Sequence, residues 1–448
     1  MVELMEGFPD HVAAYRASGQ VKKEEYEQVV MKRVNEVAAR YGKINFLVCL
    51  ETGMENYSLA SFIDYLKISF KHFKKWNRMA IVSDQRWLRT VYEALSPLVH
   101  GEIRSYELEE LETARKWVSA PLEKREVVAP PRLQAGDHLR VVAPAQSLLP
   151  KVTPDRRSRA VQRLESLGLT VSFGKHVLEI DEFKSTTVSH RIEDLHEAFA
   201  DTDVKAIMAV SGGTTSNQLL QHIDYQLIKN NPKIICGLSD ITALVNGIYR
   251  KTGLVTYYGP HFSSLTAKHD IAYTLDYFQR CLFSPDPFEL IPAPYFYNSP
   301  FEDERLLNEG YWVINEGEAE GTLVGGNFLT LNFLQGSEFM PNEARSICFL
   351  EDNGPEGVKN VQNQLQSLIN QPRFDKIRGL IIGRFKKETG MTKDLLTKII
   401  KTKEALKDIP VIANVDFGHT SPMVTLPVGG VSRMSARSDK PAITITSH

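Results

Sequence analysis

Hydrophobic and polar positions alternate in two patterns along most of the chain. Short apolar runs, which indicate buried strands, are followed by longer segments with apolar residues at the i, i+3, i+4 spacing of an amphipathic helix. Between residues 136 and 261 the two patterns recur about every thirty residues, which predicts a parallel sheet covered by helices, with its site at the carboxyl ends of the strands. In this part we expect strands at 139–143, 170–173, 206–210, 234–237 and 252–261, and helices at 156–167, 190–200 and from 240 onward.

Residues 1–120 form a separate alternating block. We expect helices at 22–41, 59–73 and 109–118 and strands at 44–50, 79–82 and 102–108, which predicts a small α/β sandwich. The next stretch, Pro121 to Pro131, combines proline with charge and has no apolar periodicity. Such a stretch is typical of a linker, which we expect over residues 121–134.

The pattern changes after residue 262. The segment 263–308 is rich in loops, prolines and aromatic residues, and it is a candidate crossing between domains and a candidate lid. From Gly310 onward short strands alternate with glycine turns; strands at 312–315, 347–350, 379–384 and 411–415 and helices at 361–369 and 393–406 are expected. The sequence therefore predicts an α/β protein with a parallel-sheet domain over 135–300 and a mixed, strand-rich domain over 301–448.

Composition narrows the class of protein. Hydrophobic residues make up 42% of the 448 residues and charged residues 24%, the usual mixture of a globular protein. The formal charge of −2 lacks the basic excess of a nucleic-acid-binding protein, so small or neutral partners fit better. The amino terminus lacks the layout of a signal peptide, and no apolar run approaches the ~18 residues that cross a bilayer. We therefore expect a cytoplasmic protein without membrane contact.

Neither a metal ion nor a cofactor is expected. His190 and His196 lie six residues apart beside Glu193 and Asp194, whereas a zinc-binding helix needs two imidazoles at i and i+4 on one face. We therefore reject a metal site at this group. The cysteines are far apart and form no C-x-x-C pair, so they indicate neither a zinc site nor a disulfide framework: Cys49, Cys236, Cys281 and Cys348.

The candidate chemistry is organised around the stretch Lys233 to Leu244, K-I-I-C-G-L-S-D-I-T-A-L. Its apolar strand runs through Ser239 into a helix that begins at Asp240. A serine on a tight turn from a parallel strand into a helix presents its hydroxyl at the carboxyl edge of the sheet, as in a nucleophile elbow. The alternative is that Ser239 only caps the helix, since serine before an apolar run is a common helix start.

A second turn, S-G-G-T-T-S from Ser211 to Ser216, follows the expected strand 206–210. The phosphate-loop motif G-x-x-x-x-G-K-[S/T] is absent from it, so this turn does not indicate a phosphate site. Gly212 and Gly213 could instead bring backbone N–H groups close to a reacting carbonyl, as in an oxyanion hole. An equally good explanation is a tight turn that requires positive φ.

Ser239, Glu351 and His419 each follow an apolar strand, and side chains at strand ends converge on one crevice of an open α/β sheet. Nucleophilic catalysis by serine needs a base within hydrogen-bond reach of the hydroxyl and a carboxylate that holds the imidazole. The three residues are therefore candidate catalytic groups. The chain has twelve histidines, so the position of one of them near a strand end is by itself weak evidence for a catalytic role.

These motifs resemble those of the LD-carboxypeptidase family of serine peptidases. Besides K-I-I-C-G-L-S-D, the resemblance rests on G-D-H-L-R-V-V-A-P at 136–144, G-T-L-V-G-G-N at 321–327, F-L-E-D at 349–352, L-I-I-G-R-F at 380–385 and F-G-H-T at 417–420. The runs S-N-Q-L-L at 216–220 and N-E-G-Y-W-V-I-N-E-G at 308–317 are most similar to the microcin C self-immunity branch. The resemblance implies that Ser239 is the nucleophile, that Glu351 orients the base His419, and that the amides of Gly213 and Asp240 bind the oxyanion.

The resemblance also implies a Rossmann-like amino-terminal half, a smaller β-rich swivelling half and a homodimer without a cofactor. Members of the family hydrolyse an amide bond next to a free carboxylate, such as the L,D bond of murein tetrapeptides. In the immunity branch the bond joins aspartate to a modified adenylate, and a longer tryptophan-bearing loop stacks on the base. Here the corresponding stretch is only Tyr295 to Arg305, and Asn363 stands where an arginine is usual.

Three functions follow as expectations from this resemblance. The first is a peptidase that acts on a small peptide. The second is a hydrolase of aminoacyl-nucleotide conjugates of the microcin C type, which would give self-immunity. The third is a non-catalytic regulator that only binds a peptide in the same crevice.

Residues 1–120 resemble SpoIIAA-like (STAS-like) domains, through the order of their elements and the run K-K-W-N-R-M-A-I-V-S-D from Lys74 to Asp84. This implies a small regulatory or binding module, to which we assign no catalytic residue. Ser83 invites comparison with the phosphorylatable serine of anti-sigma-factor antagonists. Serine and aspartate are favoured before a helix, so we expect Ser83 to cap a helix from Gln85.

Overall fold

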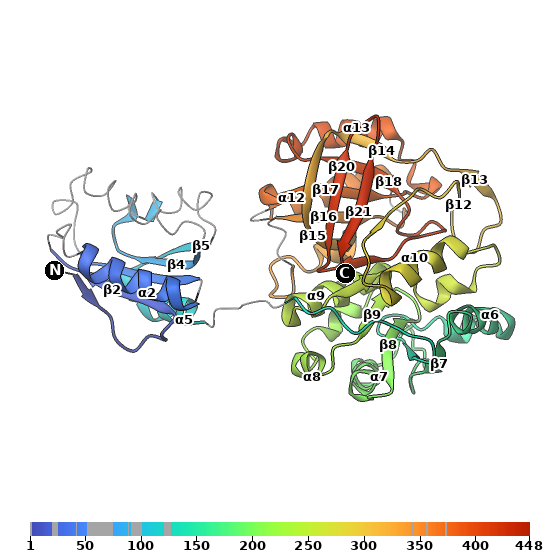
Figure 1. Cartoon of the computed structure of the whole chain (residues 1–448), viewed down its shortest axis with the longest axis horizontal. Helices are drawn as coiled ribbons and strands as arrows, with labels where there is room; N and C mark the ends of the chain where they lie inside the picture. The colour runs from blue at the N-terminus through green and yellow to red at the C-terminus, as the bar shows by residue number, and fades with distance from the viewer. Residues whose placement is uncertain are drawn as a thin grey trace. The chain divides into compact units, whose positions relative to one another are not determined.

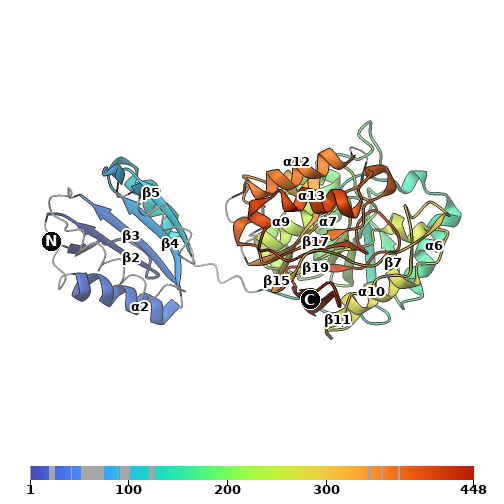
Figure 2. The ribbon, with the colours of Figure 1, turned by 90° about the horizontal axis from the view of Figure 1, so that it is seen from above.

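The computed structural model describes residues 2–19, 26–41, 43–51, 75–87, 89–90, 101–120, 127–341, 345–354, 357–371 and 374–448. They form two compact units, Met1–Lys124 and Arg125–His448, which Figures 1 and 2 draw as ribbons. Within the described ranges, no helix combines the length and apolar character needed to span a bilayer. The expected helix at 59–73 lies outside the described residues.

The amino-terminal unit contains a five-stranded sheet in the order β1-β2-β3-β4-β5, in which β1 pairs antiparallel with β2 and the other pairs are parallel. The small β1 and β2 were not expected from the sequence. The elements are β1 (Val2–Leu4), β2 (Val12–Ala17), a π-helix (Tyr26–Met31), α2 (Lys32–Tyr41), β3 (Ile44–Leu50), β4 (Trp76–Val82), β5 (Glu102–Tyr106), a 3₁₀ turn (Leu108–Glu110) and α5 (Leu111–Ser119).

Alternate residues of the central strand β3 serve two separate apolar clusters. Phe46 and Val48 pack with the face of α2, whereas Leu47 and Cys49 pack with α5. Because successive side chains of a strand point to opposite faces, α2 covers one side of the sheet and α5 covers the other among the described residues, as Figure 2 shows. The predicted α/β sandwich is confirmed.

Ser83 follows β4 and is fully buried. Its hydroxyl oxygen accepts a hydrogen bond of 3.2 Å from the N–H of Gln85. This bond places Ser83 in a turn just before the helical residues 86–87, and its capping of that helix stays a prediction.

The second unit contains two sheets. The first has six strands in the order β19-β10-β9-β8-β6-β7, all parallel except the edge strand β19. Its strands are β6 (His138–Val142), β7 (Thr170–Phe173), β8 (Val204–Ala209), β9 (Ile234–Gly237), β10 (Thr256–Tyr258) and β19 (Leu426–Val428). The helices of this part are α6 (Pro154–Glu165), α7 (Val188–Ala200), α8 (Tyr225–Asn230), α9 (Thr242–Thr252) and α10 (Ala272–Phe283), with 3₁₀ turns at Leu149–Lys151, Ser216–Leu219, Ser239–Ile241 and Phe262–Thr266.

The second sheet has eight strands in the order β11-β21-β20-β15-β16-β17-β18-β14 and mixes parallel with antiparallel pairs. Its strands are β11 (Phe288–Glu289), β14 (Trp312–Asn315), β15 (Gly317–Asn327), β16 (Ser346–Glu351), β17 (Gly379–Gly383), β18 (Val411–Val415), β20 (Val431–Ala436) and β21 (Ala442–Ser447). A separate hairpin pairs β12 (Tyr295–Tyr297) with β13 (Arg305–Leu307). The helices are α11 (Phe328–Asn332), α12 (Gly357–Ile369) and α13 (Lys393–Lys401), with 3₁₀ turns at Phe374–Lys376, Lys387–Thr389 and Glu404–Leu406.

Each of these two sheets takes an edge strand from the other half of the unit. Strand β11 lies in the segment 263–308 but pairs with β21, and β19 lies near the carboxyl end but pairs with β10. One apolar core accordingly runs through both halves. In Figure 1 the red and orange strands of the second sheet lie beside the green elements of the first.

Two parts of this unit differ from the expectation. The segment 263–308, expected to be rich in loops, contains the three-turn helix α10, which buries Tyr277, Phe278 and Cys281; the surrounding prolines and aromatic residues obscured its periodicity. Residues 127–134, expected in the linker, pack on the second unit. Val128 forms a backbone bridge to Leu254, and the Leu133 side chain, 2% exposed, belongs to the apolar core.

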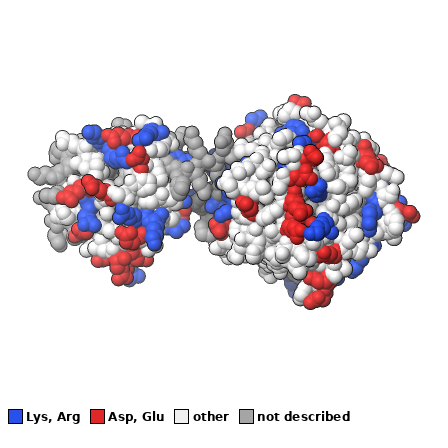
Figure 3. All heavy atoms as spheres, turned by 90° about the horizontal axis from the view of Figure 1, so that it is seen from below, with Lys and Arg blue, Asp and Glu red and all other residues white. Residues whose placement is uncertain are grey.

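Charged side chains of both signs are interspersed on the face of each unit drawn in Figure 3. That face carries no basic stripe among the described residues, in keeping with the net charge of −2.

Candidate active site

Ser239 occupies the turn between β9 and α9 in a strained conformation. Its φ is +65°, a left-handed value that a residue with a side chain rarely adopts and that is often found at functional sites. The residue at the N-cap is Leu238, and no side-chain capping bond is present. The alternative that Ser239 only caps the helix is therefore wrong.

Gly212 packs against the turn of Ser239 and Gly213 packs against Gln146, and neither position leaves room for a Cβ atom. A Cβ atom on Gly212 would lie 2.7 Å from the Cβ of Ser239, and one on Gly213 would lie 2.6 Å from Cγ of Gln146. Neither glycine has a positive φ, so close approach and not turn geometry explains them. Within the described residues, the N–H groups of Gly213 and Asp240 donate to no other group.

Asp240 joins the two turns through its buried carboxylate. One oxygen, Oδ2, accepts the N–H groups of Thr215 and Ser216 at 2.9 and 2.8 Å, and the Ser216 hydroxyl donates to the Asp240 carbonyl at 2.6 Å. Burial raises the pKa of Asp240, and the hydrogen bonds from Ser216 and Thr215 oppose that rise. The side chain therefore fixes the glycine turn relative to Ser239.

Glu351 and His419 form a short hydrogen bond at the carboxyl ends of β16 and β18. The distance from His419 Nδ1 to Glu351 Oε2 is 2.6 Å, and Glu351 is fully buried. Gly418 makes this contact possible: its φ is +104°, and a Cβ there would lie 2.7 Å from the same carboxylate oxygen. The structure therefore brings together a carboxylate and an imidazole that lie 68 positions apart in the chain.

The second oxygen of Glu351 is also occupied. Oε1 accepts hydrogen bonds from the Tyr258 hydroxyl at 2.8 Å and from Nδ2 of Asn327 at 3.0 Å. Burial raises the pKa of Glu351, but the charge and hydrogen bond of His419, together with those of Tyr258 and Asn327, outweigh it and leave the pKa below the ordinary value of 4.5. Glu351 is therefore ionised at neutral pH.

Tyr258 links this carboxylate to the turn of Ser239. Its hydroxyl oxygen accepts the N–H of Ser239 at 3.1 Å while its proton is donated to Glu351. Burial, followed by the charge of Glu351, raises the pKa of Tyr258, so the hydroxyl stays protonated. The sequence contained Tyr258 in T-Y-Y-G-P and Asn327 in G-G-N, but neither was predicted, because no pattern shows which buried polar group faces a carboxylate.

A cavity of about 310 Å³ brings the candidate residues together. Ser239, His419, Gly212 and Gly213 all line it. The Ser239 hydroxyl and His419 Nε2 form no hydrogen bond within the described residues. Hydrogen bonds between catalytic groups are often long before substrate binds. The relevant observation is therefore that Ser239 and His419 line the same cavity.

Two further cavity residues, His261 and Lys386, were not predicted. Nδ1 of His261 accepts the N–H of Ser264 at 3.2 Å, so the proton of a neutral ring lies on Nε2. Burial and then the charge of His419 lower the pKa of His261 to about 4, which keeps it neutral at pH 7. Lys386 interacts electrostatically with Glu388 but forms no salt bridge with a described residue.

The tip of the β12–β13 hairpin forms one wall of the cavity through Ser299, Pro300 and Phe301. Phe301 is 54% exposed, and the guanidinium of Arg156 lies 4.7 Å from its ring centre. Asn298 holds the hairpin to the opposite half by donating to Glu388 at 2.9 Å. The candidate lid segment therefore contributes directly to the cavity.

Comparisons with known proteins agree with this geometry. The profile of the LD-carboxypeptidase N-terminal domain matches residues 139–259, that of the LD-carboxypeptidase C-terminal domain matches residues 320–434, and the SpoIIAA-like profile matches residues 12–119.

Several known proteins are similar to this chain over its second unit. The Bacillus subtilis protein YocD is 45% identical over 327 residues, which are 71% of this chain and 99% of that protein. The microcin C7 self-immunity protein MccF of Escherichia coli is 32% identical and covers 65% of this chain and 88% of its own length. The murein tetrapeptide carboxypeptidase of Pseudomonas aeruginosa is 26% identical and covers 64% of this chain and 90% of its own length.

Solved structures give the same result. The crystal structure of an MccF-like protein from Bacillus anthracis has a TM-score of 0.70 and 44% identity, and covers 72% of this chain and all of that chain (100%). MccF in complex with aspartyl sulfamoyl adenosine has a TM-score of 0.65 and 29% identity, and covers 72% of this chain and 99% of its own. The chain therefore belongs to the LD-carboxypeptidase family of serine peptidases, to which it adds an amino-terminal SpoIIAA-like domain.

Proposed function

We propose that Ser239, His419 and Glu351 are the catalytic triad of this serine peptidase, which is of the LD-carboxypeptidase type and cleaves an amide bond next to a free carboxylate. The observation that carries the proposal is the 2.6 Å bond between buried Glu351 and His419, beside a cavity that Ser239 also lines. With Nδ1 donating to Glu351, the imidazole leaves Nε2 as the base.

In the proposed reaction the Ser239 hydroxyl oxygen attacks the carbonyl carbon of the scissile amide while Nε2 of His419 takes its proton. The tetrahedral intermediate collapses when His419 gives that proton to the leaving amine, which breaks the C–N bond and leaves an acyl-serine. Water, deprotonated by His419, then releases the acid and restores Ser239. Glu351 stabilises the imidazolium in both half-reactions.

The amides of Gly213 and Asp240 are the proposed oxyanion donors. Both are unused within the described residues, and Gly212 lets this backbone approach Ser239 without a side chain between them. Donors that are fixed before reaction stabilise developing negative charge without having to reorganise. The Asp240 carboxylate supplies that fixation by holding the glycine turn.

Lys386 is the proposed partner of the free carboxylate of the substrate, since this residue lines the cavity and forms no salt bridge with a described residue. A charge-assisted hydrogen bond of this kind contributes about 1.5–3 kcal/mol. Lys386→Met should therefore raise KM about 10- to 100-fold with little change in kcat. Lys387→Met is the matched control, because Lys387 is exposed and pairs with Glu304 outside the cavity.

The test of the triad is Ser239→Ala, assayed on a murein tetrapeptide. Loss of the nucleophile should lower kcat by at least about 10⁴-fold while the melting temperature stays close to that of the wild type. Ser166→Ala, at an exposed serine that does not line the cavity, is the control and should retain activity. Labelling of wild type by an active-serine reagent, competed by a peptide with a terminal carboxylate, separates catalysis from simple peptide binding. Unchanged hydrolysis by Ser239→Ala would refute the assignment.

A second candidate substrate is an aminoacyl-nucleotide conjugate. The specific observation is Phe301, whose half-exposed ring at the cavity wall offers a stacking surface for a base; one similar structure is MccF in complex with aspartyl sulfamoyl adenosine. Parallel kcat/KM measurements on a murein tetrapeptide and an aspartyl-adenylate analogue decide between the two. Phe301→Ala should weaken only the nucleotide reaction.

A further inference from the structure

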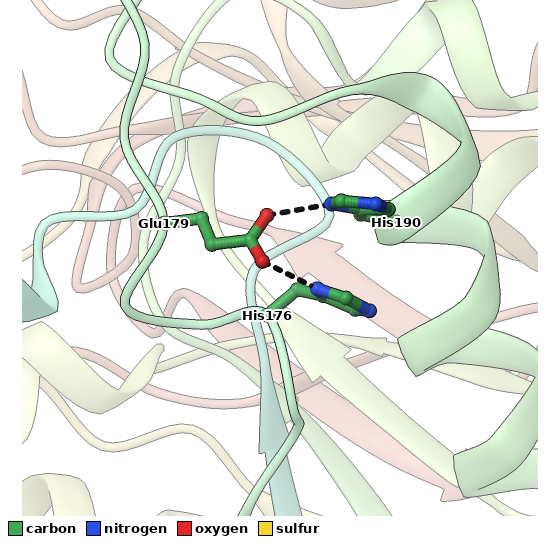
Figure 4. A group of neighbouring side chains, drawn as sticks. All are labelled: His176, Glu179 and His190. Atoms are coloured by element: carbon green, nitrogen blue, oxygen red, sulfur yellow. Dashed lines mark hydrogen bonds and ion pairs between the residues drawn. The ribbon is translucent and has the colours of Figure 1, made fainter.

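A second group of histidine and carboxylate side chains lies outside the catalytic cavity, around the loop that follows β7. His176 and Glu179 belong to this loop, and His190 lies in the first turn of α7. Figure 4 shows both imidazoles turned toward the Glu179 carboxylate. None of the three lines the catalytic cavity.

The geometry of the group is compact. Nδ1 of His176 lies 2.6 Å from one oxygen of Glu179, and Nδ1 of His190 lies 2.6 Å from the other. The two rings are stacked, with centres 4.0 Å apart and planes inclined by 16°. The three ligand atoms all lie within 4.8 Å of one another.

The surroundings hold the ligands in place. Nε2 of His176 lies 3.2 Å from Glu193, whose other oxygen pairs with Lys175 at 2.7 Å. The backbone N–H of His176 donates to the buried Asp194. A metal-binding histidine usually donates its second ring N–H to a carboxylate, which fixes its tautomer and orientation. His176 has this arrangement, with Glu193 as the supporting carboxylate.

One side of the site is buried and the other side is open to solvent. The His176 side chain is 7% exposed, whereas Glu179 is 41% and His190 39% exposed. An ion can therefore reach the ligands from solvent and keep a water molecule as a further ligand. Thr186, by donating to Glu179 at 2.6 Å, orients the carboxylate without closing that side.

We propose that His176, Glu179 and His190 bind a divalent transition-metal ion through two imidazole nitrogens and one carboxylate, the ligand set that suits zinc. Zinc bound to His and Glu takes Zn–N and Zn–O distances of about 2.0–2.2 Å, so neighbouring ligand atoms of a tetrahedral site lie about 3.3 Å apart. The present 2.6 Å hydrogen bonds must lengthen by less than about 1 Å, which the half-exposed side chains of Glu179 and His190 can accommodate. The ion replaces the Nδ1 protons, which pass to solvent.

The position of the site gives it a structural role. Its loop holds the turn 144–147: the Lys184 carbonyl accepts the N–H of Ser147 at 3.0 Å, and the Ser185 hydroxyl donates to the Ala145 carbonyl at 2.6 Å. That turn carries Gln146, which lines the catalytic cavity and packs on Gly213. A metal bound at His176, Glu179 and His190 would stabilise the wall from outside, without touching substrate.

The pair of histidines on α7 that the sequence brings to mind, His190 and His196, does not form a site. His196 points elsewhere, since its Nε2 accepts the N–H of Asp224. His190 finds its partners across the loop instead. The signal in the sequence was H-x-x-E at His176 and Glu179, but a third ligand eleven positions later could not be assigned to it without the fold.

The test is zinc binding by the full chain, free of any polyhistidine tag and stripped with EDTA. Competition with a chromophoric chelator at pH 7.5 should give one tightly bound zinc per wild-type chain and a rise in melting temperature. His190→Ala and Glu179→Gln should weaken binding at least about 100-fold, and Glu193→Gln by about 10- to 100-fold. His222→Ala, an exposed histidine on another element, should bind as the wild type does.

Anomalous scattering at the zinc edge locates the ion and should give one peak within about 2.2 Å of the three ligand atoms. Because His190 and Glu193 are partly exposed, their variants should fold, and melting curves in EDTA verify this independently of zinc. Absence of stoichiometric zinc in the wild type, or equal zinc affinity in all variants, would show that the group is only a hydrogen-bonded clamp.

Discussion

The second unit contains the same chemical pair twice, with opposite surroundings. Glu351 and His419 are joined by a 2.6 Å hydrogen bond to Nδ1, and so are Glu179 and His176. Glu351 is fully buried, whereas the Glu179 side chain is 41% exposed. Distance alone therefore does not distinguish an orienting carboxylate from a prospective metal ligand.

What separates the pairs is how the carboxylate oxygens are used. Glu351 accepts from Tyr258, Asn327 and His419, all within a buried environment, so it can serve only one imidazole and can leave Nε2 to face a substrate. Glu179 holds two imidazoles by their Nδ1 atoms and faces solvent. Mutations in one pair, with the other as reference, test whether this difference determines function.

The largest effect is expected from Glu351→Gln. If Glu351 orients His419 as proposed, the amide cannot stabilise the imidazolium and can hold His419 in the wrong tautomer, so kcat should fall by about 10³- to 10⁴-fold. KM should change little, because Glu351 does not line the cavity. Steady-state kinetics on a murein tetrapeptide measure both constants. A fall of less than tenfold would show that Glu351 is not the orienting residue.

Gly418→Ala is expected to have the next largest effect. An alanine at position 418 must keep the left-handed φ of Gly418, and its methyl group would lie 2.7 Å from Glu351 Oε2. The methyl group therefore displaces the imidazole from the carboxylate. A displacement of about 1 Å in a catalytic group costs about 10²-fold in kcat. Gly390→Ala is the control for backbone strain alone, since Gly390 has a positive φ but no neighbour within 4 Å of a Cβ. Equal kinetics for the two variants would contradict the role of the contact.

Tyr258→Phe should have a smaller effect. It removes a donor to Glu351 and the acceptor for the Ser239 N–H, which should reduce the free energy of unfolding by about 1–3 kcal/mol and kcat by about tenfold. Tyr257→Phe is the matched control, because Tyr257 is equally buried in the same strand and its hydroxyl faces Arg132 instead. Urea unfolding and kinetics together separate the two contributions.

The sequence predicted the strands of the second unit well because each is an apolar run with a clear end. The strands 234–237 and 411–415 were placed at their observed limits, and the polar residues just beyond such strands proved to lie at one cavity. Strand ends are local features that the sequence shows directly, so Ser239 and His419 could both be selected as candidates. Their meeting could not be derived from one sheet edge, because Ser239 follows β9 of the six-stranded sheet and His419 follows β18 of the eight-stranded sheet.

Contacts between side chains that helical or strand periodicity does not relate to one another could not be predicted. Tyr257 and Tyr258 are neighbours on one strand, so their side chains point to opposite sides of the sheet, Tyr258 to Glu351 and Tyr257 to Arg132. Periodicity alone does not tell which of the two tyrosines points to the site. Lys386 lines the cavity from a loop, and loop residues have no hydrophobic periodicity from which their position could be predicted. The capping interpretation of Ser239 failed for a related reason, because the sequence does not reveal its positive φ.

Glu179→Gln should leave catalysis nearly unchanged, within about twofold in kcat when EDTA is present, because the group is remote from the reacting atoms. Its effect should appear in the pH dependence of stability. Hydrogen bonds from His176, then Thr186 and His190, lower the pKa of Glu179 to about 2, and the bond to Glu179 raises the pKa of His176 above its ordinary 6.5.

The stability that wild type gains over Glu179→Gln should therefore be greatest between pH 4.5 and 6.5. Below pH 4.5 it should be lost progressively as Glu179 becomes protonated in the unfolded state first and in the folded state only near pH 2. Above pH 6.5 it should be lost as pH rises through the raised pKa of His176, whose charged form is the one that the carboxylate favours. Urea unfolding of both proteins in EDTA at pH 4, 5.5 and 8 measures the difference. A difference that stays constant across this range would mean that the exposed pair contributes no charge interaction at all.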